Sequence, residues 1–405
     1  MDDDRIVTKD FCLATVIAFL GSMTYFVLTA SVANYAIWKY GVSASEAGLA
    51  AGLFVLGGLV ARIAFGRYTE LLGRKRMLMV AMAIGVLAAS LYFFTDTFAM
   101  LCVTRLLHGA AYGICSSTVN DIVTKMLPKN KAGEGLGYFL LSNTVSMAIG
   151  PYLALVLVGT DAYDMVFTVC MAMNILSLII GPMLSVQEED LTEEQKRTAT
   201  KVTLRSLLHL PAVPLSVVTM LLTLAYSGVM SFIAVYSEDI GLEEAAPYFF
   251  VAFSAVTLAS RFTVGKLLDR KGPNYVMIPA FLCFVAGMVM YAKATDPVTF
   301  LVPGLLTGFA ISAAFPTSQT LIMRDADPTG YGSAISTYQS ITDIGTGFGP
   351  MIIGALIATS GFRDAYMLCA VTAAVSLALY WIVCGRRHLR CGKNARNRRR
   401  ITRRA

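Results

Sequence analysis

Three ionisable residues stand inside long apolar stretches, where a charged side chain is costly. Asp343, in TDIGTGFGP, is the one carboxylate deep inside such a stretch, and Arg105 and His108 stand three residues apart in RLLHGAAYG. A charge in the hydrocarbon region of a membrane costs roughly 2.5–3.5 kcal/mol on insertion scales, so each residue requires a partner, a water-filled cavity or a function. A carboxylate that gains and loses a proton, or an imidazole that titrates near neutral pH, can carry protons.

A proton-coupling site is therefore predicted, formed by these three residues and by Glu134 at the start of a later apolar stretch. Structural roles remain open for each of them. Asp343 can bond to Thr342, Thr346 or an arginine, His108 can be a buried neutral histidine, and Glu134 can cap a helix. Arg105 has no counterpart in the second half of the chain, where Gly304 occupies the matching position, and this asymmetry favours a functional role.

The elements that position these residues are predicted to be membrane helices. The chain is 56% hydrophobic and 15% charged, with a mean hydropathy of +0.64. Its apolar blocks are long enough to cross about 30 Å of hydrocarbon as helices. The sequence thus predicts an all-α membrane protein with twelve spans, at about residues 11–34, 45–66, 76–95, 98–119, 134–158, 164–186, 211–236, 246–266, 275–294, 298–322, 332–358 and 363–384.

An internal repeat relates the two halves of the chain at a constant offset of 199 positions, as between Arg62 and Arg261. A repeat of this length in an apolar chain predicts two pseudo-symmetric six-helix bundles facing a central site. The predicted units are 1–186, a cytoplasmic linker 187–210, 211–384 and a basic cytoplasmic tail 385–405. The repeated positions include Gly66/Gly265, Glu70/Asp269, Gly73/Gly272, Gly109/Gly308, Thr118/Thr317, Gly133/Gly332 and Gly150-Pro151/Gly349-Pro350.

The distribution of basic residues predicts the orientation. Of the 33 Lys and Arg residues, only Lys39, Lys293 and Arg363 fall on one face and three more in or beside spans, so that the others gather on the opposite face. By the positive-inside rule that face is cytoplasmic, with both termini inside a multi-pass protein of the inner (plasma) membrane. The net charge of +7 is then a signal of topology and does not indicate nucleic-acid binding. The chain is expected to act as a monomer in the bilayer.

Two short segments with the same spacing carry a family resemblance. GRYTELLGRKR, after the second block, and GKLLDRKGPN, after the eighth, resemble the loop signature of the major facilitator superfamily. In the first copy Glu70 replaces the usual aspartate, and Leu71 replaces the usual basic residue. The resemblance implies loops that gate the two bundles, formed here by Gly66, Glu70, Gly73, Arg74, Gly265, Asp269, Arg270 and Gly272.

The Gly150-Pro151 pair in the fifth block resembles the motif of superfamily exporters that exchange substrate for protons. Pro151 frees a carbonyl and bends a helix, while Gly150 permits close packing. Gly349-Pro350 repeats the pair, and a simple packing kink is the alternative. Ala154 stands where the motif usually continues with glycine.

Taken together, these motifs resemble the twelve-span bacterial drug:proton antiporter branch, including metallophore exporters. The resemblance implies proton-coupled efflux of small organic molecules by alternating access. Asn34 and Tyr35 stand where such exporters often carry an acidic residue or a proline, which argues against a strongly cationic substrate. The cavity is expected to be lined by Tyr25, Asn34, Tyr112, Asn143, Tyr226 and Phe309.

The alternatives are an importing symporter and a polytopic membrane enzyme. A symporter that imports a sugar or organic anion would share the fold, and the Gly150-Pro151 pair argues weakly against it. A polytopic membrane enzyme would require paired aspartates, a Ser–His pair or a zinc motif, whereas the three histidines are scattered. The eight cysteines show no metal-binding spacing. The expectation is a transporter without catalytic residues, metal or cofactor.

Overall fold

The computed structural model describes residues 6–65, 72–128, 132–158, 163–186, 209–325 and 331–386, except for the side chains of residues 132–134, 136–137, 261–262 and 331–333. This part of the chain is helical and contains no strand. The long helices are α1 (Lys9–Tyr40), α2 (Ala44–Phe65), α4 (Arg74–Leu91), α5 (Phe98–Met126), α6 (Ala132–Val158), α7 (Tyr163–Ile180), α10 (Val213–Asp239), α11 (Ala246–Lys271), α12 (Asn274–Tyr291), α13 (Pro297–Asp325) and α14 (Tyr331–Tyr380). Short 3-10 turns, η1 (Tyr92–Phe94), η2 (Gly181–Met183), η3 (Leu210–Ala212) and η4 (Glu243–Ala245), flank them, and η6 (Trp381–Gly385) extends α14.

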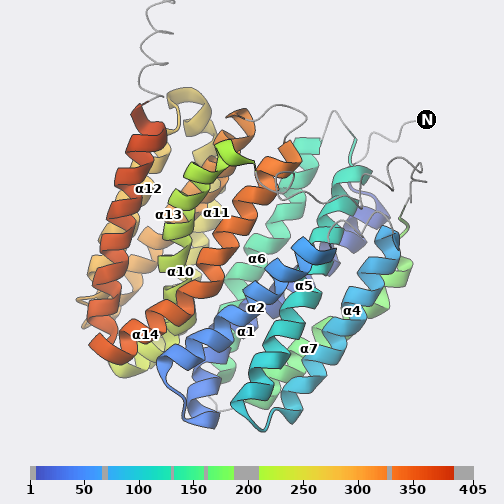
Figure 1. The fold of residues 1–405 in the computed structure, drawn as a ribbon, viewed down its shortest axis with the longest axis horizontal. Coiled ribbons are helices and arrows are strands. Elements are labelled where there is room, and N and C mark those ends of the chain that lie inside the picture. Colours follow the sequence, from blue (N-terminus) through green and yellow to red (C-terminus); the bar gives the residue numbers. More distant parts are fainter. Residues whose placement is uncertain are drawn as a thin grey trace, which may run out of the picture.

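Helix α14 contains two spans. Gly361 interrupts it with φ 81° and ψ 171°, a left-handed conformation that glycine adopts readily. Figure 1 shows one arm descending from Tyr331 to a turn at the base of the molecule and a second arm returning beside α12. The described residues contain ten helices long and apolar enough to cross a membrane, or eleven with α11, which bends by 45° between Ser260 and Thr263. One of these spans, Ala334–Gly385, holds both arms of α14, so that counting the arms separately gives twelve. The predicted number of spans is confirmed.

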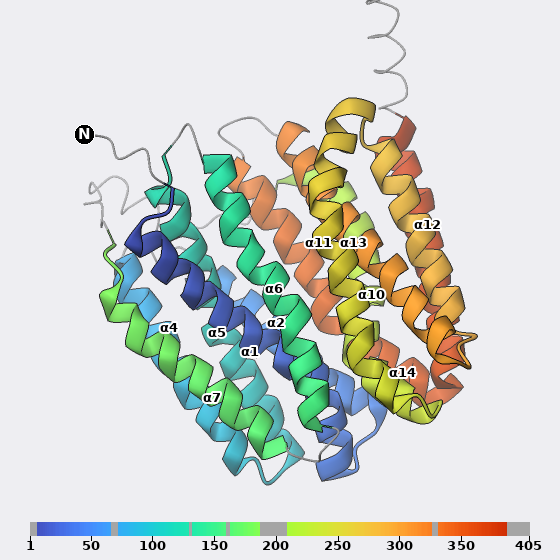
Figure 2. The same cartoon turned by 180° about the vertical axis from the view of Figure 1, so that it is seen from behind.

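The helices form two groups that lie side by side. Figures 1 and 2 show α1, α2 and α4–α7 on one side and α10–α14 on the other, here called the N-terminal and C-terminal halves. The halves meet mainly through three helix pairs, α2 with α14, α6 with α11, and α1 with α10, and α2 also touches α10. Residues 187–208, which hold nearly all of the predicted linker, lie outside the described residues, so the predicted domain boundaries remain a prediction.

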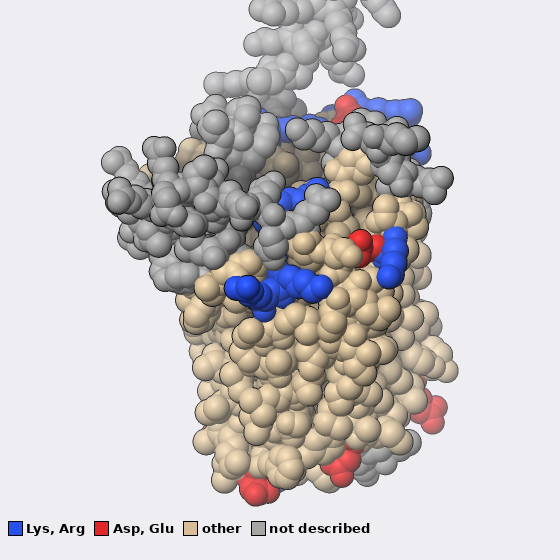
Figure 3. Space-filling model, turned by 90° about the vertical axis from the view of Figure 1, so that its right-hand side faces the viewer, with Lys and Arg blue, Asp and Glu red and all other residues tan. Residues whose placement is uncertain are grey.

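The two ends of the molecule differ in charge. In Figure 3, Lys and Arg lie in the upper part of the visible face, whereas Asp and Glu occur mainly along the lower rim. The last turns of α5, α11 and α13 carry Lys125, Lys271 and Arg324 at the upper end, here named the basic end. The other is named the acidic end. Helix α1 begins and α14 finishes at the basic end, so the first and last described helices start and stop on the same side (Figures 1 and 2).

The repeat in the sequence is also a repeat in conformation. Gly73 before α4 and Gly272 after α11 have φ of 89° and 93°, so both copies of the loop motif depend on a residue without a Cβ. The aromatic core repeats as well, because Tyr92 stacks on Phe167 with ring centroids 4.9 Å apart, and Tyr291 packs against Tyr366 at 5.5 Å. Both residues of the second pair lie 199 positions after their counterparts in the first. The duplicated sequence therefore encodes two similar helical packings.

Candidate functional site

An ion pair joins the two halves between the last turn of α2 and α14. The guanidinium of Arg62, near the end of α2, donates a hydrogen bond to the carboxylate of Asp343 on α14. The Arg62 side chain is 29% exposed and that of Asp343 22%, so the pair is largely removed from solvent. An ionised carboxylate at such a position is tolerated because it is paired. The partner of Asp343 is an arginine of the opposite half, which is a contact that its structural alternative named, so its role in proton coupling stays a prediction.

An aromatic cluster of the N-terminal half lies within electrostatic range of this pair. Tyr25 stacks on Tyr112, with ring centroids 5.6 Å apart and planes 7° apart, and both rings pack against Phe54. The charge of Asp343 acts on both tyrosines, and that of Arg62 acts on Tyr112. A change in the charge of the pair therefore alters the electrostatic environment of both phenols.

The C-terminal half contributes aromatic side chains at the same interface. The hydroxyl of Tyr226 on α10 lies 4.0 Å from the sulfur of Met147 on α6, across the two halves. The ring of Tyr226 stacks on Phe253 with centroids 5.8 Å apart. Phe309 is partly buried against the large aromatic core. Tyr25, Tyr112 and Tyr226 thus lie near the interface, while Phe309 contacts the core.

Arg105 lies inside the N-terminal half. It is fully buried, and its guanidinium donates to the carbonyls of Ala50 and Ala51 on α2 at 2.9 and 3.1 Å. It also lies over the ring of Phe54, 4.6 Å from the centroid. These hydrogen bonds satisfy the donors of the guanidinium and link α5 to α2. The structure does not bring Arg105 together with Asp343.

The C-terminal half fills the equivalent space differently. The positions that match Ala50 and Arg105 are Phe249 and Gly304. A Cβ at Gly304 would lie 2.8 Å from the ring of Phe249, so the ring occupies the space beside this glycine. The C-terminal half thus fills this space with the ring of Phe249 on α11, whereas the N-terminal half fills it with Arg105 on α5. The asymmetry that favoured a functional Arg105 therefore also has a packing explanation.

His108 belongs to the same buried cluster as Arg105. It is 2% exposed, and its Nδ1 lies 3.4 Å from the hydroxyl of Tyr92. Its ring packs against Phe54 at 5.4 Å. This position is in the interior of the N-terminal half, whereas Asp343 lies at the interface between halves. The side chain of Glu134 lies outside the described residues, so its predicted role rests on the sequence.

The halves meet closely toward the acidic end, where glycines of α2 face the backbone of α14. A Cβ at Gly52 would lie 1.8 Å from the carbonyl oxygen of Gly347, and one at Gly48 would lie 2.1 Å from that of Pro350. The amide of Asn34 on α1 donates to the carboxylate of Glu238 on α10 at 3.1 Å. Asn34 therefore contributes to a contact between halves near the acidic end. Together these contacts close the acidic end in this conformation.

The two Gly-Pro pairs pack within each half in matching ways. A Cβ at Gly150 on α6 would lie 2.8 Å from Cβ of Phe26 on α1. One at Gly349 on α14 would lie 2.1 Å from the hydroxyl of Ser227 on α10. Both glycines thus permit close helix packing, which a simple packing kink would also require, so the exporter motif stays a prediction. Pro151 and Pro350 lie inside their helices.

The described parts of the two loops predicted to act as gates form ion pairs inside each half. Arg74 is 4% exposed and donates to Asp121, which ties the start of α4 to α5 at the basic end. In the second copy Asp269 pairs with Arg324 at 2.8 Å, and both side chains are exposed. Gly66 and Glu70 lie outside the described residues. Arg270 is exposed in the last turn of α11, and a Cβ at Gly265 would meet nothing within 4 Å.

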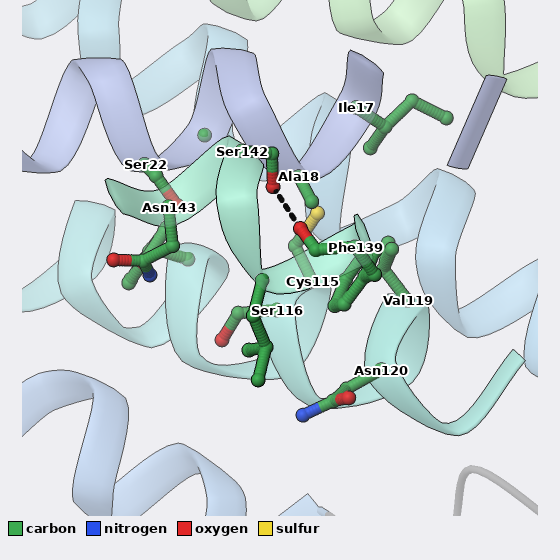
Figure 4. A pocket seen from close by; sticks show the side chains of 13 residues that line it. Ile17, Ala18, Ser22, Cys115, Ser116, Val119, Asn120, Phe139, Ser142 and Asn143 are labelled. Atoms are coloured by element: carbon green, nitrogen blue, oxygen red, sulfur yellow. Dashed lines mark hydrogen bonds between the residues drawn. The ribbon is translucent and has the colours of Figure 1, made fainter. Parts of the chain in front are cut away.

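A cavity of about 110 Å³ lies between α1, α5 and α6 in the N-terminal half. Its lining includes Tyr112 and Asn143, two of the predicted cavity residues, together with Ser22, Ser116 and Asn120 (Figure 4). The sequence offered a signal for the last three, since each is a polar residue inside a long apolar helix. In the described part of the chain, no cluster of His, Cys, Asp or Glu could hold a metal ion.

This arrangement defines a class of protein: a polytopic helical transporter with two similar halves and an ionisable pair between them. The chain belongs to the Major Facilitator Superfamily, whose family model matches residues 11–330 and 250–402. It is accordingly a membrane transporter and not an enzyme, and the predicted family and fold are confirmed.

Characterised relatives and a solved structure support this assignment. The chain is 23% identical over 333 residues to the multidrug resistance protein MdtG of Escherichia coli, covering 80% of this chain and 81% of the relative. It is 19% identical over 351 residues to the staphylopine export protein of Staphylococcus aureus, covering 84% and 88%. Its fold resembles the crystal structure of the nucleoside transporter NupG, with a TM-score of 0.73 and 14% sequence identity. That match covers 93% of this chain and 99% of the NupG chain.

Proposed function

We propose that the protein exports small organic molecules and that protons moving in the opposite direction drive the export. The observation that carries this proposal is the Arg62–Asp343 ion pair between the two halves. A transporter couples a proton to movement when the proton changes the relative free energy of its conformations. A titratable carboxylate at the interface between moving halves satisfies that condition.

The coupling step follows from the contacts of the pair. Ionised Asp343 holds Arg62 and so links α14 to α2. Protonated Asp343 carries no charge, so the ionic attraction between the halves is lost and their separation costs less free energy. Protonation from one side of the membrane and release to the other would alternate these states and drive the exchange.

Export is supported by two further observations. The relatives named above are a multidrug resistance protein and a staphylopine export protein. The Gly150-Pro151 pair also resembles a motif typical of exchange-type exporters. Several aromatic side chains at the interface suit an amphipathic substrate with ring systems.

The function can be tested with a substrate panel in cells that lack their own efflux pumps. Cells expressing the protein should accumulate less of at least one small organic compound than control cells. An uncoupler should restore accumulation, because it collapses the proton gradient. Uptake that rises with expression and falls with the uncoupler would instead identify an importing symporter.

The orientation in the membrane has its own test. If the basic end faces the cytoplasm, a reporter fused after Arg390 should read as cytoplasmic, and a reporter inserted between Glu238 and Glu244 should read as external. This placement would put both termini inside a multi-pass protein of the inner membrane. The opposite pair of signals would reverse the orientation, and with it the proposed direction of transport.

A further inference from the structure

The cavity between α1, α5 and α6 differs in its chemistry from the Arg62–Asp343 pair at the interface between the halves. None of its lining residues is Asp, Glu, Lys, Arg or His. Figure 4 shows Ser22, Ser116 and Asn143 toward one side and Ile17 and Phe139 toward the other. The lining thus combines hydroxyl and amide groups with apolar side chains, without a charge to balance a charged ligand.

The two amides of the cavity are available for a ligand. Asn143 lies well inside α6, Asn120 lies near the end of α5, and both side chains are exposed although the cavity lies among membrane helices. An exposed amide at membrane depth requires a polar partner or water, since hydrocarbon provides neither donor nor acceptor. The hydroxyls of Ser116 and Ser142 donate to backbone carbonyls of their own helices, at 3.2 and 2.6 Å.

The size of the cavity limits what it can hold. Sites for whole drug-sized ligands are usually about 300–1,000 Å³. A space of about 110 Å³ suits one ring or a short polar group, and is therefore a subsite for part of a larger molecule. Tyr112 lines the cavity and also lies within range of the charges on Arg62 and Asp343, which connects the subsite to the coupling pair.

We propose that this cavity recognises an uncharged, hydrogen-bonding end of the substrate: a hydroxyl, carbonyl or amide carried on a ring. The inference rests on the proposed transport function and specifies its substrate class. Asn143 and Asn120 bond the polar group, and Ile17 and Phe139 contact the ring. A permanent cation is rejected because its charge would lose water and find no counter-charge in the lining.

Two single-ring probes of similar size distinguish these ligands: 4-hydroxybenzamide, which is neutral, and (3-hydroxyphenyl)trimethylammonium, a permanent cation. Binding to the purified full-length protein is measured by thermal stabilisation, without a proton gradient. The neutral probe should stabilise the wild type, and the cation should not at the same concentration. Asn143→Leu should weaken binding of the neutral probe about tenfold, as expected for the loss of a hydrogen bond worth about 1.4 kcal/mol.

Two variants sharpen this test. Thr372→Val removes an exposed hydroxyl of α14 that bonds within its own helix, and should leave binding unchanged. Asn143→Asp places a carboxylate in the cavity and should allow the cation to bind. Equal binding of both probes to the wild type, no binding of the neutral probe, or unchanged binding in Asn143→Leu would each overturn the inference. Because the assay uses no gradient, it can fail while proton-coupled export stands.

Discussion

Asp343→Asn is expected to abolish export driven by a pH gradient while substrate binding and downhill exchange remain measurable. Asparagine keeps the size of the side chain and most of its hydrogen-bonding capacity, but it cannot take up or release a proton. The substitution therefore mimics the protonated state permanently. The measurement is transport into or out of proteoliposomes with and without an imposed pH gradient.

A second variant separates proton transfer from structural pairing. Asp343→Asn leaves Arg62 without its counter-charge, which alone can disturb the interface. In the double variant Arg62→Gln/Asp343→Asn neither charge is present, so an interface that merely required balanced charge should recover gradient-driven transport. Continued loss in the double variant assigns the proton to Asp343. Asp364→Asn changes an exposed aspartate on the same helix and should behave as the wild type.

Gradient dependence at the wild-type level in Asp343→Asn would contradict this assignment. The proton would then have to be carried by another of the predicted groups, namely His108 or Glu134. His108 is enclosed beside the buried Arg105, so it would need a path for water through the N-terminal half. The structure therefore ranks Asp343, with its side chain at the interface, ahead of His108.

The helices and their repeat could be predicted from the sequence because both leave local signals. Membrane spans are marked by length and apolar composition, and Gly73 and Gly272 mark turns that require a positive φ. The bend at Gly361 also falls between two predicted spans. These features depend on residues close together in the chain, so no knowledge of packing was necessary.

The partner of Asp343 illustrates what such signals miss. Arg62 and Asp343 are 281 positions apart, and only the packing of α2 on α14 brings them together. The sequence showed a lone carboxylate and three arginines in or beside the spans, so a pair was foreseeable, but its members were not. The partners of Arg105 were hidden for another reason. They are the backbone carbonyls of Ala50 and Ala51, and no sequence pattern identifies backbone atoms as partners.

The contact between α2 and α14 leads to a second strong prediction. Gly52→Ala should displace the protein from the conformation with a closed acidic end and reduce transport severely. The added methyl would lie 1.8 Å from the carbonyl oxygen of Gly347, whereas carbon and carbonyl oxygen normally approach to about 3.3–3.6 Å. Overpacking typically costs about 1–3 kcal/mol, which shifts a two-state balance by roughly 5- to 150-fold.

Cross-linking at the acidic end can report this shift. Asn34 and Glu238 contact each other across the halves, so cysteines at these two positions should cross-link when that end is closed. Introducing Gly52→Ala should lower the yield several-fold and lower substrate export with it. Thr372→Ala is the control, because it changes an exposed side chain of α14 whose hydroxyl bonds within its own helix. If Gly52→Ala left the yield unchanged, or if both alanine variants lowered it equally, the glycine contact would not control closure. A selective loss in Gly52→Ala would mean that α2 and α14 must separate when the acidic end opens, and the Arg62–Asp343 pair joins these same two helices.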